Sequence, residues 1–218
     1  MPVITALEVH QRNRESVKLF LDDKFAMDLP LLQAAQLHQG QLLTQAEVDA
    51  LADAGIFQSA FDRAVRFLSY RPRSIAEVRR YLVNAGVAAS IIDAVLERLQ
   101  QRGYLDDLAF AKFWLENRNR FKPMAPRALR HELWRKDVDA GIIDAVLSEF
   151  DAEEAAYRAA QGRLQRYKGN TRQVFRRKLS GMLRRRGFDS ETINDVVLRL
   201  QQRLDESEDG YFDRDVDE

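Results

Sequence analysis

The stretch IIDAVL at positions 91–96 occurs again, letter for letter, at positions 142–147. The repetition is longer than six letters, because sliding the chain on itself by 51 positions aligns the apolar residues of 78–99 with those of 129–150 without a gap. A further shift of 50 positions continues the same columns through 179–200. The chain therefore contains three repeats of one unit of about 50 residues.

The spacing of the apolar positions within each repeat indicates two helices. Apolar residues fall at i and i+4 and then, after a short break, at i, i+3 and i+7, which marks one face of each of two consecutive helices. Ser74 and Glu77 form an S-x-x-E capping box that begins the first of these helices in repeat one. Gly86 and Gly187 stand at the break in repeats one and three, where a left-handed residue would end the first helix, and repeat two has Asp137 there.

A further helix-like segment precedes each pair of helices, so each unit has room for three helices. These segments are residues 61–70, 108–121 and 153–167. We therefore expect a mainly α protein that contains three tandem three-helix repeats in an elongated array. Such an array suits a long partner better than it suits an enclosed active site.

The beginning of the chain differs from the repeats. Two strand-like segments, 3–10 and 16–22, are followed by a predicted hairpin turn at Asp22-Asp23, and a T-x-x-E capping box at 44–47 precedes a short helix. We expect a small β-hairpin and short helices before the repeats. The predicted division is 1–56 for this element, 57–104, 105–150 and 151–204 for repeats one to three, and 205–218 for a tail.

The formal net charge of zero conceals three segments of different sign. Residues 1–58 contain 4 Lys and Arg against 8 Asp and Glu, residues 59–204 contain 29 against 18, and residues 205–218 contain 1 against 8. A basic body between acidic ends is typical of a protein that binds phosphate groups or an acidic protein surface. The acidic tail has too few apolar residues to pack, so we expect it to be disordered and to compete for the basic body.

Catalytic and metal-binding patterns are missing from the sequence. There is no cysteine, the three histidines lie far apart, and no P-loop, G-x-S-x-G or H-E-x-x-H motif occurs. We expect a protein that is not an enzyme and uses no cofactor or metal ion. The adjacent Asp106 and Asp107 are interpreted as helix caps. No window approaches the ~18 apolar residues that span a bilayer, so a soluble, cytoplasmic protein is expected.

Basic residues recur in the same columns of successive repeats. Arg127 aligns with Arg177, and Arg135 aligns with Arg185. Arginines also solubilise ordinary surface helices, but recurrence by column favours a binding face. The candidate binding residues, here called the basic set, are Arg127, Arg130, Arg135, Lys136, Arg177, Lys178, Arg184, Arg185 and Arg186. Four aromatic residues at helical spacing are interpreted as core: Tyr81, Phe113, Trp114 and Trp134.

Four segments together resemble the RecX regulatory family: RPRSIAEVRRYL (71–82), GYLDDLAFAKFW (103–114), LRHELWRKDV (129–138) and LRRRGF (183–188). The resemblance covers residues from about 57 to 204. Carried over by position, the motif residues of the family are Arg71, Arg73, Ser74, Glu77, Asp106, Asp107, Phe110, Ala111, Lys178, Arg185, Arg186, Gly187 and Phe188. Asp137 departs from the glycine that the family usually has at that turn.

The resemblance implies a function in DNA repair, homologous recombination and the SOS response. Members of the family bind the RecA recombinase filament and modulate its ATPase, its strand exchange and its stimulation of repressor cleavage. We therefore expect a monomeric regulator that binds the RecA–DNA filament through the basic set and inhibits it, with single-stranded DNA as a second contact. The alternatives are a general nucleic-acid-binding helical module, such as a helix-turn-helix transcription factor, and an assembly scaffold.

Overall fold

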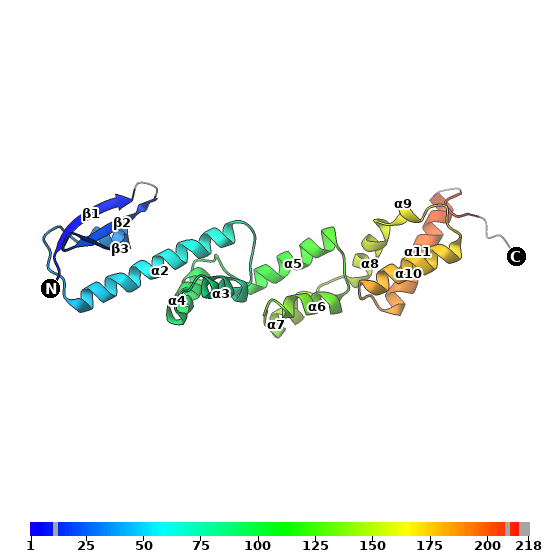
Figure 1. Cartoon of the computed structure of the whole chain (residues 1–218). Helices are drawn as coiled ribbons and strands as arrows, with labels where there is room; N and C mark the ends of the chain where they lie inside the picture. The colour runs from blue at the N-terminus through cyan, green and yellow to red at the C-terminus, as the bar shows by residue number, and fades with distance from the viewer. Residues whose placement is uncertain (11–12, 208–209, 214–218) are drawn as a thin grey trace. The chain divides into compact units, whose positions relative to one another are not determined.

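The computed structural model describes residues 1–10, 13–207 and 210–213 (Figure 1). Contacts between residues divide the chain into two compact units, Met1–Asp106 and Asp107–Glu218. The described residues form three strands and eleven helices, and repeats one, two and three each supply a separate helical core. The protein is therefore mainly helical, as the apolar columns predict.

The first unit begins with a three-stranded antiparallel sheet, of which the expected hairpin is a part. The strands, in the order β1-β2-β3, are β1 (Ile4–His10), β2 (Asn13–Leu21) and β3 (Lys24–Pro30). Asp22 and Asp23 have φ values of 49° and 65°, which is the left-handed geometry of a tight two-residue hairpin turn. Apolar residues on one face of the sheet, among them Ile4, Leu19 and Leu29, pack against each other and against the start of the next long helix.

Two helices follow the sheet: α1 (Leu31–Ala34) and α2 (Gln45–Ser69). The capping box of Thr44 and Glu47 begins α2, as predicted. The prediction of a short helix here, with a separate helix at 61–70, is wrong, because α2 continues for 25 residues. The boundary expected at 56/57 therefore falls inside one helix.

Gly55 explains this error. Glycine in a helical pattern often marks the end of a helix, but in α2 it allows a strand to approach closely. A Cβ atom built on Gly55 would lie 2.5 Å from the carbonyl oxygen of Asp28 in β3. Glycine is therefore needed at this position because the backbone of the sheet contacts the backbone of the helix, and no local pattern reveals that contact.

We expect Gly55→Ala to lower the free energy of unfolding of the first unit by about 1–3 kcal/mol, because the added methyl group overlaps a backbone atom that cannot rotate away. Urea unfolding followed by circular dichroism measures this change. Gly181→Ala is the matched control, because a Cβ there meets only the flexible Arg185 side chain at 3.6 Å. That substitution should stabilise its helix by up to about 1 kcal/mol. A Gly55→Ala protein as stable as the parent would contradict the close approach.

The remaining helices make up the rest of the three repeats. They are α3 (Ile75–Asn84), α4 (Ala89–Gln101), α5 (Asp107–Phe121), α6 (Pro126–Trp134), α7 (Ala140–Ser148), α8 (Ala152–Gln161), α9 (Leu164–Tyr167), α10 (Arg172–Arg185) and α11 (Ser190–Ser207). Most positions of the aligned apolar columns are buried, and the exceptions, Val87 and Phe150, are partly buried and pack against the repeat cores. Two of these columns have no exposed surface. One column consists of Val78, Leu129 and Leu179, and the other consists of Leu82, Leu133 and Leu183.

The predicted breaks between the paired helices are confirmed. Gly86, Asp137 and Gly187 have φ values of 78°, 55° and 89°, so all three adopt the left-handed conformation. Aspartate is one of the few non-glycine residues that tolerates this conformation. Repeat two therefore makes the same turn as its neighbours despite the missing glycine.

Repeat three departs from the predictions at its beginning and at its end. The helix expected over 153–167 is interrupted at Gly162, between α8 and α9. The expectation of a disordered tail from 205 is wrong for 205–207 and 210–213, because α11 continues to Ser207 and Tyr211 is only 1% exposed in the repeat-three core. Residues 208–209 and 214–218 of that tail lie outside the described part of the chain.

Candidate functional site

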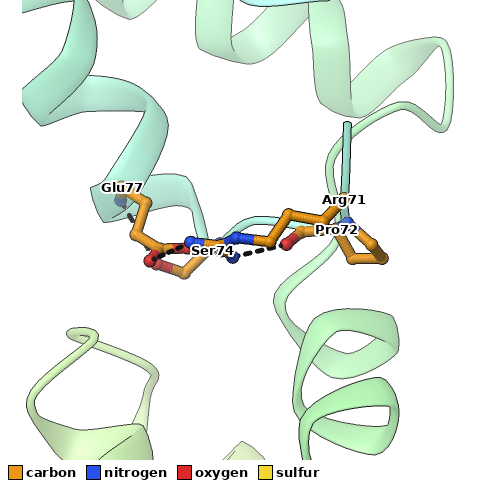
Figure 2. A network of polar contacts seen from close by, with 4 residues as sticks. All are labelled: Arg71, Pro72, Ser74 and Glu77. Carbon is orange, nitrogen blue, oxygen red and sulfur yellow. Dashed lines mark hydrogen bonds and ion pairs between the residues drawn. The ribbon is translucent and has the colours of Figure 1, made fainter. Parts of the chain in front are cut away.

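The RPRS segment of the family motif forms a polar network between α2 and α3 (Figure 2). Ser74 is the N-cap of α3, and its fully buried hydroxyl accepts the Glu77 backbone N–H at 3.2 Å. The Glu77 carboxylate accepts the Ser74 backbone N–H and also binds both terminal nitrogens of Arg71, at 3.0 and 3.2 Å. A third hydrogen bond from Arg71 reaches the carbonyl of Pro72 at 2.8 Å. The network fixes the chain between the two helices.

Arg73 has a different role in the same segment. Its guanidinium lies 3.8 Å from the centre of the Phe67 ring, and that ring stacks on Tyr81 at 4.1 Å. Burial, followed by the nearby Arg71, lowers the pKa of Arg73. Both motif arginines of repeat one therefore act within the scaffold, which leaves the other motif residues and the basic set as candidates for binding.

We expect Glu77→Ala to lower the free energy of unfolding of the first unit by about 1–3 kcal/mol, because one carboxylate completes a capping box and a two-point arginine pair. Thermal or urea unfolding measures the loss. The exposed Glu97, on α4, provides the control, since Glu97→Ala should change stability by less than about 0.5 kcal/mol. Equal stability of the two variants would show that the network of Figure 2 contributes little.

The second and fourth motif segments also contribute mainly to packing. Phe110 and Ala111 are buried in the repeat-two core, and Phe188 is buried in the repeat-three core. Asp107 is the first residue of α5, which is the position expected for an acidic residue near a helix N-terminus. Within residues 1–10, 13–207 and 210–213, no cluster of three or more His, Cys, Asp or Glu side chains could hold a metal ion.

The basic residues of repeat two lie on and just after α6. Arg127 and Arg135 are exposed, and neither forms an ion pair with any residue that the structure describes. Arg130 forms an ion pair with Asp144 of α7, and the aligned residues of repeat one, Arg79 and Asp93, pair in the same way at 2.7 Å. The recurrence of Arg130 by column therefore reflects a structural pair between helices.

Lys136 is held against the core rather than presented to solvent. Its ammonium group lies 4.3 Å from the centre of the Trp114 ring, and Arg118 lies over the same ring at 4.6 Å. The indole N–H of Trp114 donates to Glu132 at 2.9 Å, and Arg118 donates to the same carboxylate oxygen at 2.7 Å. Of the four basic residues predicted in repeat two, Arg127 and Arg135 are therefore the ones available to a partner.

Trp134 corrects the interpretation of the aromatic residues as core. Its side chain is 68% exposed, whereas Leu129 and Leu133 supply the buried face of α6. Trp134 follows Leu133 directly, so it points about 100° away from that face. Arg127 and Arg130 precede Trp134 by seven and four residues. An exposed indole and two arginines therefore lie along one side of the helix.

The basic residues of repeat three lie on α10. Arg177, Arg184 and Arg185 are exposed, and none forms an ion pair within the described part of the chain. Lys178 donates to the side-chain oxygen of Asn170 at 2.6 Å. These four residues therefore present positive charge to solvent along one helix.

Arg186 joins repeat three to repeat two. Its side chain donates to the carbonyl of Pro123 at 3.0 Å, and its own carbonyl accepts the Ala125 backbone N–H at 3.0 Å. Burial, followed by the nearby Arg163, lowers the pKa of Arg186. The neighbouring Gly187 lies against the same segment, because a Cβ there would lie 3.5 Å from the Ala125 side chain. Arg186 is thus half-buried at the joint between repeats.

Comparison with protein-family models shows to which family the chain belongs. Three family models match in succession: "RecX, first three-helix domain" over 60–99, "RecX, second three-helix domain" over 106–147 and "RecX, third three-helix domain" over 151–197. Together they cover more than half of the chain. The protein belongs to the RecX family. The resemblance of the four sequence segments is confirmed, and each matched range falls within one of the helical repeats.

Relatives and solved structures extend the match within the RecX family. "Regulatory protein RecX" of Listeria welshimeri is 30% identical over 207 residues, which are 93% of this chain and 77% of the relative. Its namesake in Bacillus licheniformis is 32% identical over 215 residues, with coverages of 96% and 81%. A crystal structure of regulatory protein RecX has a TM-score of 0.70 at 22% identity, covering 90% of this chain and 98% of that one. The fold is therefore shared with a solved RecX protein.

A groove of about 450 Å³ in repeat three contains two basic residues that the sequence analysis missed. Arg163, between α8 and α9, and Arg166, within α9, line it together with Arg177 and Arg185 of α10. No column of the repeats contains them, because the interruption of the helix at Gly162 belongs to repeat three alone. The unusual glycine inside an otherwise helical segment was the one local signal.

By length alone, α2 with 25 residues and α11 with 18 could span a membrane. Across residues 1–10, 13–207 and 210–213, no helix is both long and apolar enough to cross a bilayer.

Proposed function

We propose that this member of the RecX family binds a RecA–DNA filament and lowers its ATPase, strand exchange and coprotease activities without itself catalysing a reaction. The family supports a regulatory function, since its members are named as regulatory proteins. The observation that carries the proposal is a set of exposed arginines, on or just after α6 of repeat two and on α10 of repeat three, with which no described acidic residue forms an ion pair. They are Arg127, Arg135, Arg177, Arg184 and Arg185.

The tandem arrangement suggests how binding would regulate the filament. Two neighbouring repeats within one compact unit present the same helix and the same kind of charge, so each repeat can contact a successive protomer of a repeating partner. A ligand that binds one filament conformation better than another shifts the filament toward it. Binding across protomers would therefore hold the filament in one conformation and slow ATP turnover. Contact with the DNA phosphates would add a component that depends on salt.

The test is the single-stranded-DNA-dependent ATPase of RecA, titrated with the parent protein and with an Arg177/Arg184/Arg185→Ala variant of unchanged helicity. We expect the parent to lower the ATPase below equimolar ratio, and the variant to need at least about tenfold more protein. The control is Arg63/Arg66/Arg98→Ala, which removes three exposed arginines from the first unit and should act like the parent. Equal inhibition by all three proteins would overturn the assignment of the face.

A further inference from the structure

The groove of repeat three brings together five cationic side chains around a position without a side chain. Arg163, Arg166, Arg177, Lys178 and Arg185 line it. Gly181 of α10 also lines the groove, and a Cβ there would meet only the guanidinium of Arg185, at 3.6 Å. The aligned position in repeat two is His131 and in repeat one Arg80. Repeat three therefore has an open path to the helix backbone where the other repeats have large side chains.

One side of the groove is formed by α10, and the other side is formed where the helix that precedes α10 is interrupted between α8 and α9. In repeat two the equivalent helix, α5, is continuous over 15 residues, whereas in repeat three α8 ends at Gln161 and α9 begins at Leu164. Arg163, at the interruption, and Arg166, inside α9, reach the same hollow as the arginines of α10. The groove thus depends on a feature of this repeat rather than on the shared repeat pattern.

The cations of the groove lack the partners that other arginines of repeat three have. Arg158 pairs with Glu154 at 2.9 Å, Arg172 pairs with Asp205 at 2.6 Å, and Arg199 pairs with Glu153 at 3.6 Å. By contrast, no residue in the described ranges forms an ion pair with any of the five groove cations, and no aspartate or glutamate lines the groove. Acidic residues are thus available in this repeat, but they are paired outside the groove.

Concentrated positive charge of this kind is unfavourable unless an anion occupies it. Arg163 is near enough to Arg186, at the joint between repeats, to lower the pKa of that guanidinium in addition to the effect of burial. Arginine binds phosphate oxygens through two parallel hydrogen bonds, and an unobstructed backbone permits close approach. Five cations around a hollow of about 450 Å³ match more than one phosphate group.

We propose that this groove is a binding site for closely spaced phosphate groups. Two sources share this chemistry: successive phosphates of a nucleic-acid strand, and the polyphosphate chain of a nucleotide. If the ligand is a nucleic-acid strand, the groove rests on the proposed function and gives its DNA-phosphate contact a site; if the ligand is a nucleotide, the groove adds a ligand to that function. It is tested without any recombinase, so its failure would leave the proposed function standing.

The experiment uses the whole chain and two probes. Fluorescence anisotropy follows a labelled single-stranded oligothymidylate, and isothermal titration calorimetry follows inorganic tripolyphosphate. The groove variant is Arg163→Gln/Arg166→Gln, which changes two residues outside the basic set. A second variant, Gly181→Glu, places a carboxylate among the cations in a residue type that favours a helix more than glycine does, so loss of fold is not expected. The matched control is Arg63→Gln/Arg66→Gln in the first unit.

We expect the parent and the control to bind at least one probe, and both groove variants to weaken that binding about tenfold or more near 0.1 M salt. For the oligonucleotide, the slope of log affinity against log salt should fall by about 0.7 for each phosphate that a variant no longer neutralises. Binding of the oligothymidylate with no calorimetric binding of tripolyphosphate would identify a nucleic-acid backbone, and binding of tripolyphosphate alone would identify a nucleotide. Binding of neither probe, or an equal weakening in the control, would overturn the proposal.

Discussion

Replacing Trp134 by alanine is expected to weaken inhibition of the RecA filament about 30-fold, which corresponds to the ~2 kcal/mol of an interface hot spot. Tryptophan and arginine are the residues most enriched at such positions. Trp134 is 68% exposed and follows Arg127 and Arg130 along one side of α6. Unlike the exposed Phe121 of α5, Trp134 lies on the helix that carries Arg127 of the proposed binding face, so a partner on that face is expected to bury it. The concentration of protein that halves the RecA ATPase measures the effect.

The same substitution should leave stability almost unchanged, within about 0.5 kcal/mol, because an exposed side chain has little packing to lose. Phe121→Ala is the matched control, since Phe121 lies in the same unit and is 70% exposed. That variant should inhibit like the parent. Full inhibition by Trp134→Ala, or an equal loss with Phe121→Ala, would remove Trp134 from the proposed interface.

Replacing Tyr211 by alanine is expected to have the largest effect on stability, a loss of about 3–5 kcal/mol. The ring is 1% exposed and packs edge-on against Phe175, with ring centres 5.9 Å apart. Its hydroxyl donates to the carbonyl of Leu164 at 2.5 Å, and its backbone carbonyl accepts the Gly169 N–H at 3.0 Å. A residue beyond the last helix therefore completes the core of repeat three. Urea unfolding of the full chain measures the loss.

Tyr211→Phe separates the ring from the hydroxyl. It should cost only about 1 kcal/mol, because it removes one hydrogen bond and keeps the packing. If Tyr211→Ala were as stable as the parent, residues 210–213 would not belong to the core. The expected competition of the acidic tail for the basic body can be tested by deleting part of the tail. The deletion must begin at 214, because deleting 205–218 would also remove Tyr211 and Asp205, the partner of Arg172.

The repeats could be predicted because their information is local and periodic. Leu82, Leu133 and Leu183 occupy one apolar column, and each is fully buried in its own repeat. The left-handed turn after each of these helices was likewise indicated by Gly86 and Gly187. Three copies of one pattern reinforce each other, so the helical pairs and the family could be inferred from the sequence.

The errors arise where residues distant in the sequence meet. Gly55 looks like a helix end until β3 is placed against α2, and Tyr211 lies in a segment whose composition predicts disorder. Arg186 looks like a surface arginine, but its partner is the Pro123 carbonyl of the preceding repeat. Arg163 joins the basic groove only because its helix is interrupted. The candidate site was therefore predicted in its charge and its helices, but not in which cations are free and which are paired.

The most direct test of the central claim is whether binding depends on the filament. Biolayer interferometry would compare immobilised single-stranded DNA, bare or coated with RecA and a slowly hydrolysed ATP analogue, across a range of salt concentrations. We predict at least about 100-fold tighter binding to the coated DNA, a difference of about 2.7 kcal/mol. The bare strand should show the weaker and more strongly salt-dependent binding of phosphate contacts alone. Equal affinity for bare and coated DNA would contradict the account and identify a general nucleic-acid-binding protein.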